Sequence, residues 1–538
     1  MTTSRGGLGS GSTGHFRRIS WVVVCLAALG FAGSTAAPVA AAARSVASTQ
    51  ARRAGGHLTV VSVEPSGSWV GMDPFLSTIS PGTAAMFPVW DPLFNLDPVT
   101  NGILTNSLAT SYHVSGGGLT VTINLRKGVK FQDGTAFNSD AVVWNLERYQ
   151  SSVVGSECAS YLTVVASITA SSPYQVTVQL NQRDAGFIPL LATQQCALMV
   201  SPTAYQAEGA NFTNDPVGTG PFIYSSGEPG TVANFASFSG YWGGKPLLSS
   251  VTIEAVPSND AAFSALKSGA AQAWLSLVDI GAVPQILEAR ADHNLKVSNG
   301  TSASITYVCF SFTNSPFDNR LAREAVTYAT DSKVIDASLY HNLDKPIEGI
   351  FPPSSWAYDG GVEKGYPSYN LSKAQADVKA IHGLSFTLMV ANTPSQLQLG
   401  EALQAQWQQA GITALLNPVP ASSLAASLHA QSYQGMLLNA PGLPDPDNIA
   451  YRWFYSGSSF TQNGLKSDVV DKYIVQGRSD YGRAARKSSY LKLNQYLTSL
   501  DTWDDIASTS PYNIVDKNVM GLPVNPFSVF PWASVWVK

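Results

Sequence analysis

The chain has 538 residues, enough for about three or four domain-sized units. Charged residues make up only 13% of it and hydrophobic residues 45%, a composition that argues against disorder. The net charge of −4, spread without long runs of one sign, argues against nucleic acid as a partner.

The N-terminus has the order of segments that is typical of an export signal. Arg17 and Arg18 precede an apolar run at 19–31, and small residues follow at 34–43. The run is too short to span a bilayer, so we expect a signal at 1–43 cleaved near Ala40–Ala43, with an uncleaved anchor as the alternative. A linker at 44–54 would follow. Cys25 lies in the middle of the run, where it matches a lipid-attachment signal poorly. We therefore expect an exported protein, which would be extracellular, periplasmic or at the cell surface.

Strands and helices are expected to alternate along the rest of the chain, which predicts an α/β fold. Strands are indicated by apolar or β-branched runs at 58–63, 119–125, 175–180, 222–225, 305–312, 384–390 and 412–416. Helices are expected to begin at Asn138 or Ser139, at Asp318, at Asn370 and at Ser395, with another at 260–268.

Three cysteines remain once the signal is removed, and an exported protein can keep a disulfide. Cys158 and Cys196 are the closest pair in sequence and are expected to form it. Cys309 lies in the strand expected at 305–312 and is expected to be a buried thiol.

Recurrent catalytic patterns are missing from the sequence. It contains no G-x-S-x-G elbow, no P-loop and no H-E-x-x-H. Ser264 and Lys267 match the S-x-x-K pattern, but the partner motifs are absent and the expected helix at 260–268 explains the spacing. The seven histidines are scattered, whereas zinc sites need clustered ligands. We therefore predict no enzyme activity, no metal site and no cofactor.

The segment Thr122–Arg148 (TINLRKGVKFQDGTAFNSDAVVWNLER) closely resembles the signature of family 5 extracellular solute-binding proteins. These are the dipeptide, oligopeptide and nickel receptors of ABC importers. The resemblance continues in order along nearly the whole mature chain, through the blocks WDPLF (90–94), LATSY (108–112), PVGTGPF (216–222), YWGGKP (241–246), NSPFDNR (314–320), AGI (410–412) and DPDN (445–448).

This resemblance implies a two-lobe periplasmic-binding-protein-like fold of class II and cluster C type, with an extra subdomain in lobe I. Lobe I would comprise 55–302 and 508–538, with the subdomain inserted at 88–210, and lobe II would comprise 303–507. Hinges would lie near 302–304 and 500–508. The implied protein is a monomer that captures a peptide or another small polar solute by hinge closure and presents it to an ABC permease.

One position departs from the pattern of the peptide-binding relatives. In them, an Asp three residues before the acidic-Pro step anchors the α-ammonium of the peptide, and here that position is Gly442, ahead of Asp445-Pro446. Asn439 likewise stands where relatives often carry Trp. A buried ammonium without a counter-ion is costly, so we expect weak binding of ordinary dipeptides unless Asp445 or Asp447 substitutes. The alternative role for Asp445 is a turn-capping carboxylate.

The remaining site residues are chosen because aromatic and neutral polar side chains would suit a roomy, neutral pocket. The candidate ligand-binding residues are Trp69, Met72, Trp90, Trp274, Asn314, Asn439, Gly442, Asp445 and Trp453. Two other functions stay open: a secreted hydrolase, and a receptor that keeps the fold without transport. The identity of the ligand, whether peptide, sugar, metal chelate or other, is also left open.

Overall fold

The computed structural model describes residues 54–63, 71–75, 88–97, 102–151, 158–192, 196–228, 230–277, 280–343, 345–360, 366–440, 442–458, 460–524 and 530–538. The expected export signal, the expected linker apart from residue 54, and Trp69 lie outside these ranges. Within them, no helix combines the length and the apolar character that crossing a membrane requires. Helices and strands alternate along the described chain, which confirms the expected α/β class.

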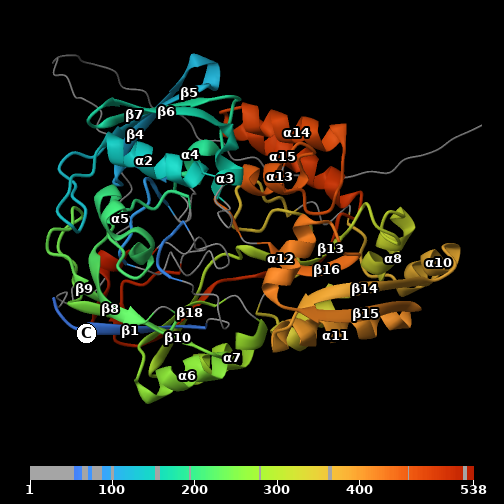
Figure 1. Cartoon of the computed structure of the whole chain (residues 1–538). Helices are drawn as coiled ribbons and strands as arrows, with labels where there is room; N and C mark the ends of the chain where they lie inside the picture. The colour runs from blue at the N-terminus through green and yellow to red at the C-terminus, as the bar shows by residue number, and fades with distance from the viewer. Residues whose placement is uncertain are drawn as a thin grey trace, which may run out of the picture. The chain divides into compact units, whose positions relative to one another are not determined.

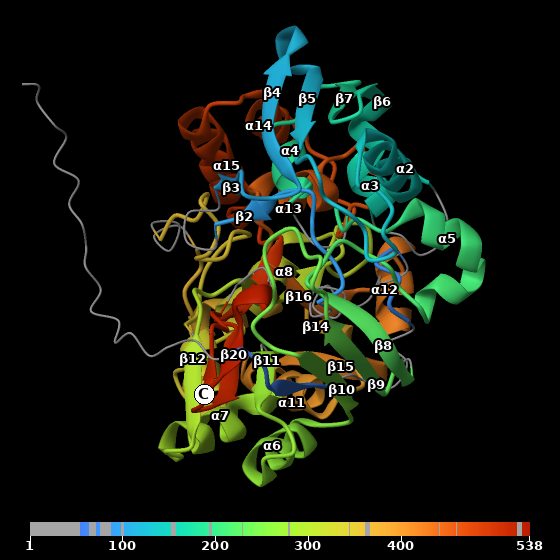
Figure 2. The same ribbon diagram turned by 90° about the vertical axis from the view of Figure 1, so that its left-hand side faces the viewer.

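A seven-stranded mixed sheet is built around β1 (His57–Val63), the first expected strand. β1 pairs in parallel with β10 (Ser250–Val256) and β11 (Ala273–Leu277). The order is β12-β18-β11-β1-β10-β9-β8, with β8 at Phe222–Glu228, β9 at Val232–Ser237, β12 at Leu295–Asn299 and β18 at Tyr512–Asp516. Helices α6 (Asn259–Ser268) and α7 (Val283–Ala291) pack on one face of this sheet (Figures 1 and 2).

A five-stranded sheet carries a hydrophobic core on each face. Its order is β15-β14-β16-β13-β17, with β13 at Ser304–Phe310, β14 at Leu384–Ala391, β15 at Ile412–Val419, β16 at Gly435–Ala440 and β17 at Trp503–Thr509. Side chains alternate along β13, so Phe310 joins one core and Tyr307 the other. The Phe310 core includes α8 (Arg320–Ala329), α10 (Leu371–Ala380) and α11 (Pro394–Gln409). The Tyr307 core includes α12 (Ala421–His429), α13 (Pro446–Phe454), α14 (Asp468–Ser479) and α15 (Arg483–Thr498).

A four-stranded antiparallel sheet forms a third part of the fold, which we call the small-sheet part. Its order is β4-β5-β7-β6, with β4 at Ala109–Ser115, β5 at Thr120–Leu125, β6 at Val165–Ser172 and β7 at Gln175–Leu180. Its core cluster draws on residues 75–199 and includes α2 (Ser139–Gln150), α3 (Cys158–Tyr161) and α4 (Phe187–Leu190). Gln132 ties this part to β8, because its side-chain amide donates to the carbonyl oxygens of Gly220 (3.0 Å) and Phe222 (2.7 Å).

Short elements complete the described chain. They are α5 (Pro202–Glu208), α9 (Ser332–Ile335), the strand pair β2 (Asn95–Leu96) and β3 (Ile103–Leu104), and the pair β19 (Val519–Met520) and β20 (Trp536–Val537).

Two of the four expected helix starts are wrong by one or two residues. Asn138 and Asn370 cap α2 and α10 as expected, by accepting backbone N–H groups in the first turn. The cap of α8 is Asn319 rather than Asp318, since its amide oxygen accepts from the N–H of Leu321 (3.0 Å). The cap of α11 is Thr393 rather than Ser395, because Pro394 fixes the first helical position and needs no N–H partner there.

The chain passes twice between the seven-stranded and the five-stranded sheets, at 300–303 and at 510–511. The two passages run side by side: the N–H of Gly300 donates to Pro511 (3.0 Å), and that of Ala303 donates to Thr509 (3.1 Å). The return expected at 508 therefore falls inside β17, two residues before the chain leaves the five-stranded sheet.

Cys158 and Cys196 form a disulfide with their Cα atoms 5.3 Å apart. Both belong to the core of the small-sheet part, where the bridge joins α3 to the segment after α4. Cys309 is buried in β13 as a free thiol beside the hydroxyl of Tyr433 (3.3 Å). Burial raises the pKa of the Cys309 thiol to about 12.

If the expected export signal is removed together with Cys25, we predict that the protein carries one free thiol and that this thiol is unreactive until the fold opens. A thiol with so high a pKa has almost no thiolate at pH 8, and it is shielded from reagent. Intact-mass spectrometry after iodoacetamide should show no label on the native protein and one label after denaturation without reductant. Three labels on denatured, unreduced protein would contradict the Cys158–Cys196 pairing.

Candidate functional site

Most of the candidate ligand-binding residues are part of the hydrophobic cores. Trp69 lies outside the described residues. Met72 and Trp90 belong to one core beside the seven-stranded sheet, Trp274 belongs to the core on its other face, and Trp453 belongs to the Tyr307 core. All four are at most 5% exposed. The indole N–H groups of Trp90 and Trp453 are buried there without a hydrogen-bond partner among the described residues.

Asn314 and Asn439 are more accessible than those four residues. Asn314 lines a depression of about 360 Å³ with Tyr433 and Gln434, and its amide donates to the carbonyl oxygens of Gln431 (2.7 Å) and Tyr433 (2.8 Å). Asn439 is exposed on β16, where its side-chain oxygen accepts from the hydroxyl of Thr306 (2.7 Å).

Gly442 packs directly against one of the two passages between the sheets. A Cβ atom at this position would overlap the carbonyl oxygen of Ala303, so no side chain fits here unless the backbone moves. The position at which the resemblance implies an anchoring carboxylate is therefore closed by the backbone in this chain.

Asp445 caps α13 and is fully engaged by an arginine. It is 1% exposed, and its carboxylate accepts from the N–H of Asp447 (3.0 Å). Both of its oxygens also accept from the guanidinium of Arg486 on α15, at 2.8 and 2.5 Å. The capping role that the sequence left as an alternative for Asp445 is confirmed.

A second buried carboxylate, Asp447, lies two residues further along, in the first turn of α13. It accepts from the hydroxyl of Tyr490 (3.0 Å), and it lies 3.5 Å from a guanidinium nitrogen of Arg478 on α14. Burial raises the pKa of Asp447 to about 7. The same guanidinium lies 3.6 Å from the centroid of the Tyr451 ring.

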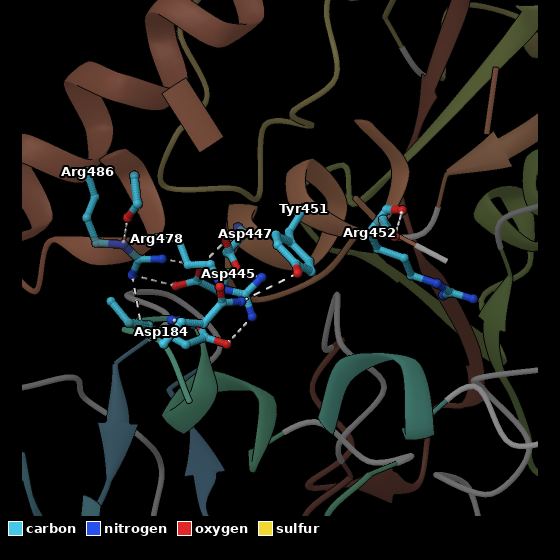
Figure 3. Close-up of polar contacts among 12 residues, drawn as sticks. Asp184, Asp445, Asp447, Tyr451, Arg452, Arg478 and Arg486 are labelled. Atoms are coloured by element: carbon cyan, nitrogen blue, oxygen red, sulfur yellow. Dashed lines mark hydrogen bonds and ion pairs between the residues drawn. The ribbon is translucent and has the colours of Figure 1, made fainter. Parts of the chain in front are cut away.

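Arg478 also forms an ion pair with Asp184, which precedes α4 in the small-sheet part (Figure 3). The whole cluster, here called the charge cluster, comprises Asp184, Asp445, Asp447, Arg478 and Arg486. Its three carboxylates outnumber its two guanidinium groups, so full ionisation would leave a buried net charge of −1. Burial and the neighbouring carboxylates raise the pKa of Asp447, which favours its protonated form and so lowers that excess.

Further hydrogen bonds join the small-sheet part to the region of α13–α15 around the charge cluster. Arg452 donates to the hydroxyl of Tyr161 (2.8 Å), the N–H of Ala185 donates to the carbonyl of Arg478 (2.9 Å), and Tyr481 donates to the carbonyl of Gly118 (2.9 Å). A cleft of about 990 Å³ opens beside Tyr481, with β4 on one wall and α14 and α15 on the other. Two parts of the fold that are remote in sequence therefore meet in a polar interface.

The family model for bacterial extracellular solute-binding proteins, family 5 Middle, matches residues 104–461. The chain belongs to this family. Among curated relatives, the glutathione-binding protein GsiB of Escherichia coli O6:K15:H31 is 32% identical over 525 residues, which cover 94% of this chain and 97% of that protein. GsiB of Shigella flexneri is 30% identical over 534 residues with the same coverage. The family 5 proteins are binding proteins, and the expected class of function is confirmed at that level.

Solved structures share the fold of this family 5 chain. The dipeptide-binding protein of Pseudoalteromonas sp. SM9913 in complex with Met-Leu has a TM-score of 0.79 at 21% identity, covering 90% of this chain and 100% of that one. The protein MoaA of A. tumefaciens R10 in complex with mannopinic acid has a TM-score of 0.78 at 19% identity, with the same coverage. These likenesses confirm the expected periplasmic-binding-protein fold.

Sequence reasoning missed Asp184, Arg478 and Arg486. Asp184 and Arg478 are 294 residues apart, and nothing in their local sequence separates a buried, paired charge from a solvated one. Asp445 and Asp447 drew attention only because they follow the Gly442 position of the family 5 pattern.

Proposed function

We propose that this chain is the ligand-capturing receptor of an ABC importer, exported and monomeric, and that it encloses a peptide or another small polar solute between two lobes by hinge closure. The membership in family 5 carries this proposal. Mass spectrometry of ligand that co-purifies with the protein from its native host tests it. One small solute recovered in a near one-to-one ratio is expected, and its uptake should be lost when the gene is deleted.

The connections between the sheets support two lobes. In this proposal the seven-stranded sheet and the small-sheet part make lobe I, and the five-stranded sheet makes lobe II, with divisions near those expected at 302–303 and 507–508. The passages at 300–303 and 510–511 would be the hinges. They are hydrogen-bonded to each other, so both would bend together as one ribbon.

Two alternative functions predict different results. A secreted hydrolase would show specific turnover in a broad hydrolase screen, and that turnover would be abolished by one Ser or Asp substitution. A receptor without transport would bind a solute but would leave uptake unchanged when the gene is deleted. Either result would replace the importer proposal.

We further propose that the ligand carries no α-ammonium at the position of Gly442. The backbone of Ala303 leaves no room for a carboxylate there. Asp445 cannot substitute, because Arg486 holds both of its oxygens, and Asp447 is buried against Tyr490 and Arg478. An ammonium bound at this place would be buried without a counter-ion.

Isothermal titration calorimetry tests this ligand class. Free dipeptides and glutathione, which carry an α-ammonium, are expected to bind weakly or not at all. N-acetylated dipeptides and a matched oligosaccharide set avoid the unpaired charge, and we expect the tighter ligands among them. Sub-micromolar binding of free dipeptides would show that another acid has taken over the anchor. If that binding were lost in Asp445→Asn without loss of thermal stability, Asp445 would be that acid.

A further inference from the structure

The ion pair between Asp184 and Arg478 is a buried charged contact that spans the proposed lobes. Asp184 lies at the start of α4 in the small-sheet part, and Arg478 lies in the last turn of α14. Their side chains are only 5% and 6% exposed. The other ion pairs of the charge cluster, Arg486–Asp445 and Arg478–Asp447, join helices of the same proposed lobe.

The local structure holds each partner in place before the two meet. The carboxylate of Asp184 accepts the N–H of Gly186 (2.8 Å), which fixes its side chain at the entry of α4. The guanidinium of Arg478 is held from the other side by the ring of Tyr451 and by Asp447. The backbones adjoin as well, because the N–H of Ala185 donates to the carbonyl of Arg478. Both partners are therefore held in place before they meet, so little side-chain entropy is lost when the pair forms.

We propose that Asp184 and Arg478 are affinity-determining residues that act as a latch: they keep the two lobes closed in the absence of ligand, and so reduce the cost of closure that ligand binding must meet. The inference rests on the proposed hinge closure. If most of the ligand-free receptor is already in the closed form, its apparent affinity for ligand is close to the affinity of the closed form itself. The latch therefore sets affinity without touching the ligand.

Asp184→Asn is the variant that isolates the latch. The amide keeps the size of the side chain and an oxygen that can accept from Gly186, so the entry of α4 is preserved. Arg478 keeps Asp447 and Tyr451. What is lost is the charge pairing across the lobes, whereas Arg478 and Asp447 belong to the same proposed lobe and stay paired in either form, so the closed population should fall.

Asp73→Asn is the matched control. Asp73 forms an equally buried ion pair with Arg148, but both residues lie within proposed lobe I. We expect this control to lower the melting temperature while the lobes stay closed.

The experiment uses the full exported chain, freed of co-purified ligand by unfolding in guanidinium and refolding with the disulfide intact. Spin labels on Ser171→Cys in β6 and Val475→Cys in α14 report the distance between the lobes, and both positions are exposed. In the labelled parent protein and in the labelled Asp73→Asn control, one short-distance population is expected. With Asp184→Asn, a longer-distance population should appear.

Identical distance distributions with and without the Asp184 charge would overturn the latch, as would a ligand-free parent protein that is already open. These distances are measured without ligand. A failure to find any captured solute would overturn the proposed function and leave the latch result unchanged, so the two proposals fail separately.

Discussion

Arg486→Met should lower the free energy of unfolding by about 3–5 kcal/mol, because it leaves the carboxylate of Asp445 buried without its partner. Asp445 is 1% exposed and both of its oxygens bind this guanidinium. The variant also removes the hydrogen bond from Arg486 to the carbonyl of Gly477 (2.9 Å), which joins the end of α14 to α15. Chemical denaturation followed by tryptophan fluorescence measures the loss.

An exposed ion pair gives the control for this prediction. Lys267 and Glu288 join α6 to α7, and their side chains are 50% and 56% exposed. Such pairs are screened by water and add little, so Lys267→Met should leave the denaturation midpoint unchanged. If Arg486→Met were as stable as the parent, the charge of Asp445 would have to be compensated by some other group. Arg486 would then not be the group that stabilises the charge of Asp445, the residue that caps α13.

The stability of the protein should fall as the pH rises from about 5 to about 8, and Asp504→Asn should remove part of that fall. Asp504 is buried in β17, and burial raises its pKa to about 8. The hydroxyl of Thr330 donates to it (2.6 Å) and accepts from the indole of Trp407 (2.8 Å). The folded protein therefore holds a proton that the unfolded chain has already released.

The sign follows from this difference in proton binding. A carboxyl with a raised pKa in the folded state contributes stability that is complete below its ordinary pKa and is lost as the pH rises through about 8. One such group changes the free energy of unfolding by about 1.4 kcal/mol per pH unit within that window. Burial raises the pKa of the adjacent Asp505 well above its ordinary value, which adds to the trend.

Melting curves at pH 5, 7 and 9 decide the matter. The parent should lose more stability between pH 5 and pH 9 than Asp504→Asn, because an amide is neutral at every pH. The exposed Asp140→Asn at the start of α2 serves as a control and should follow the parent. Parallel curves for the parent and Asp504→Asn would mean that Asp504 is ionised in the folded protein.

Local patterns were enough to predict elements whose side chains alternate or whose ends carry a strong signal. The strand at 175–180 matches β7 in full, because its apolar residues recur at every second position and face one core. The start of α11 was predicted at Ser395, but the helix is capped by Thr393 and begins at Pro394. The sequence did contain this signal, because a proline that directly follows a capping residue is typical of a first helical position.

The candidate site was harder to predict because its residues are selected by tertiary contacts. A tryptophan in the core and a tryptophan in a ligand pocket have the same local sequence properties, so Trp90, Trp274 and Trp453 could not be separated from ligand contacts. The Gly442 departure was visible because the resemblance supplied an expected residue at that position. The overlap with Ala303 that explains it depends on the passage at 300–303 and could only come from the structure.

The position of β18 has a consequence for how the chain is made. β18 pairs with both β11 and β12. In the sequence, however, all five strands of the five-stranded sheet come after β12 and before β18. Until the last thirty or so residues have been synthesised, β11 and β12 lack the strand that lies between them in the sheet. The seven-stranded sheet therefore stays incomplete until the end of translation. The small-sheet part does not share this dependence, because its sheet and core come from one contiguous earlier stretch of the chain. A stop codon before Ser510 would therefore remove β18 and leave β11 and β12 without the strand that joins them in the sheet.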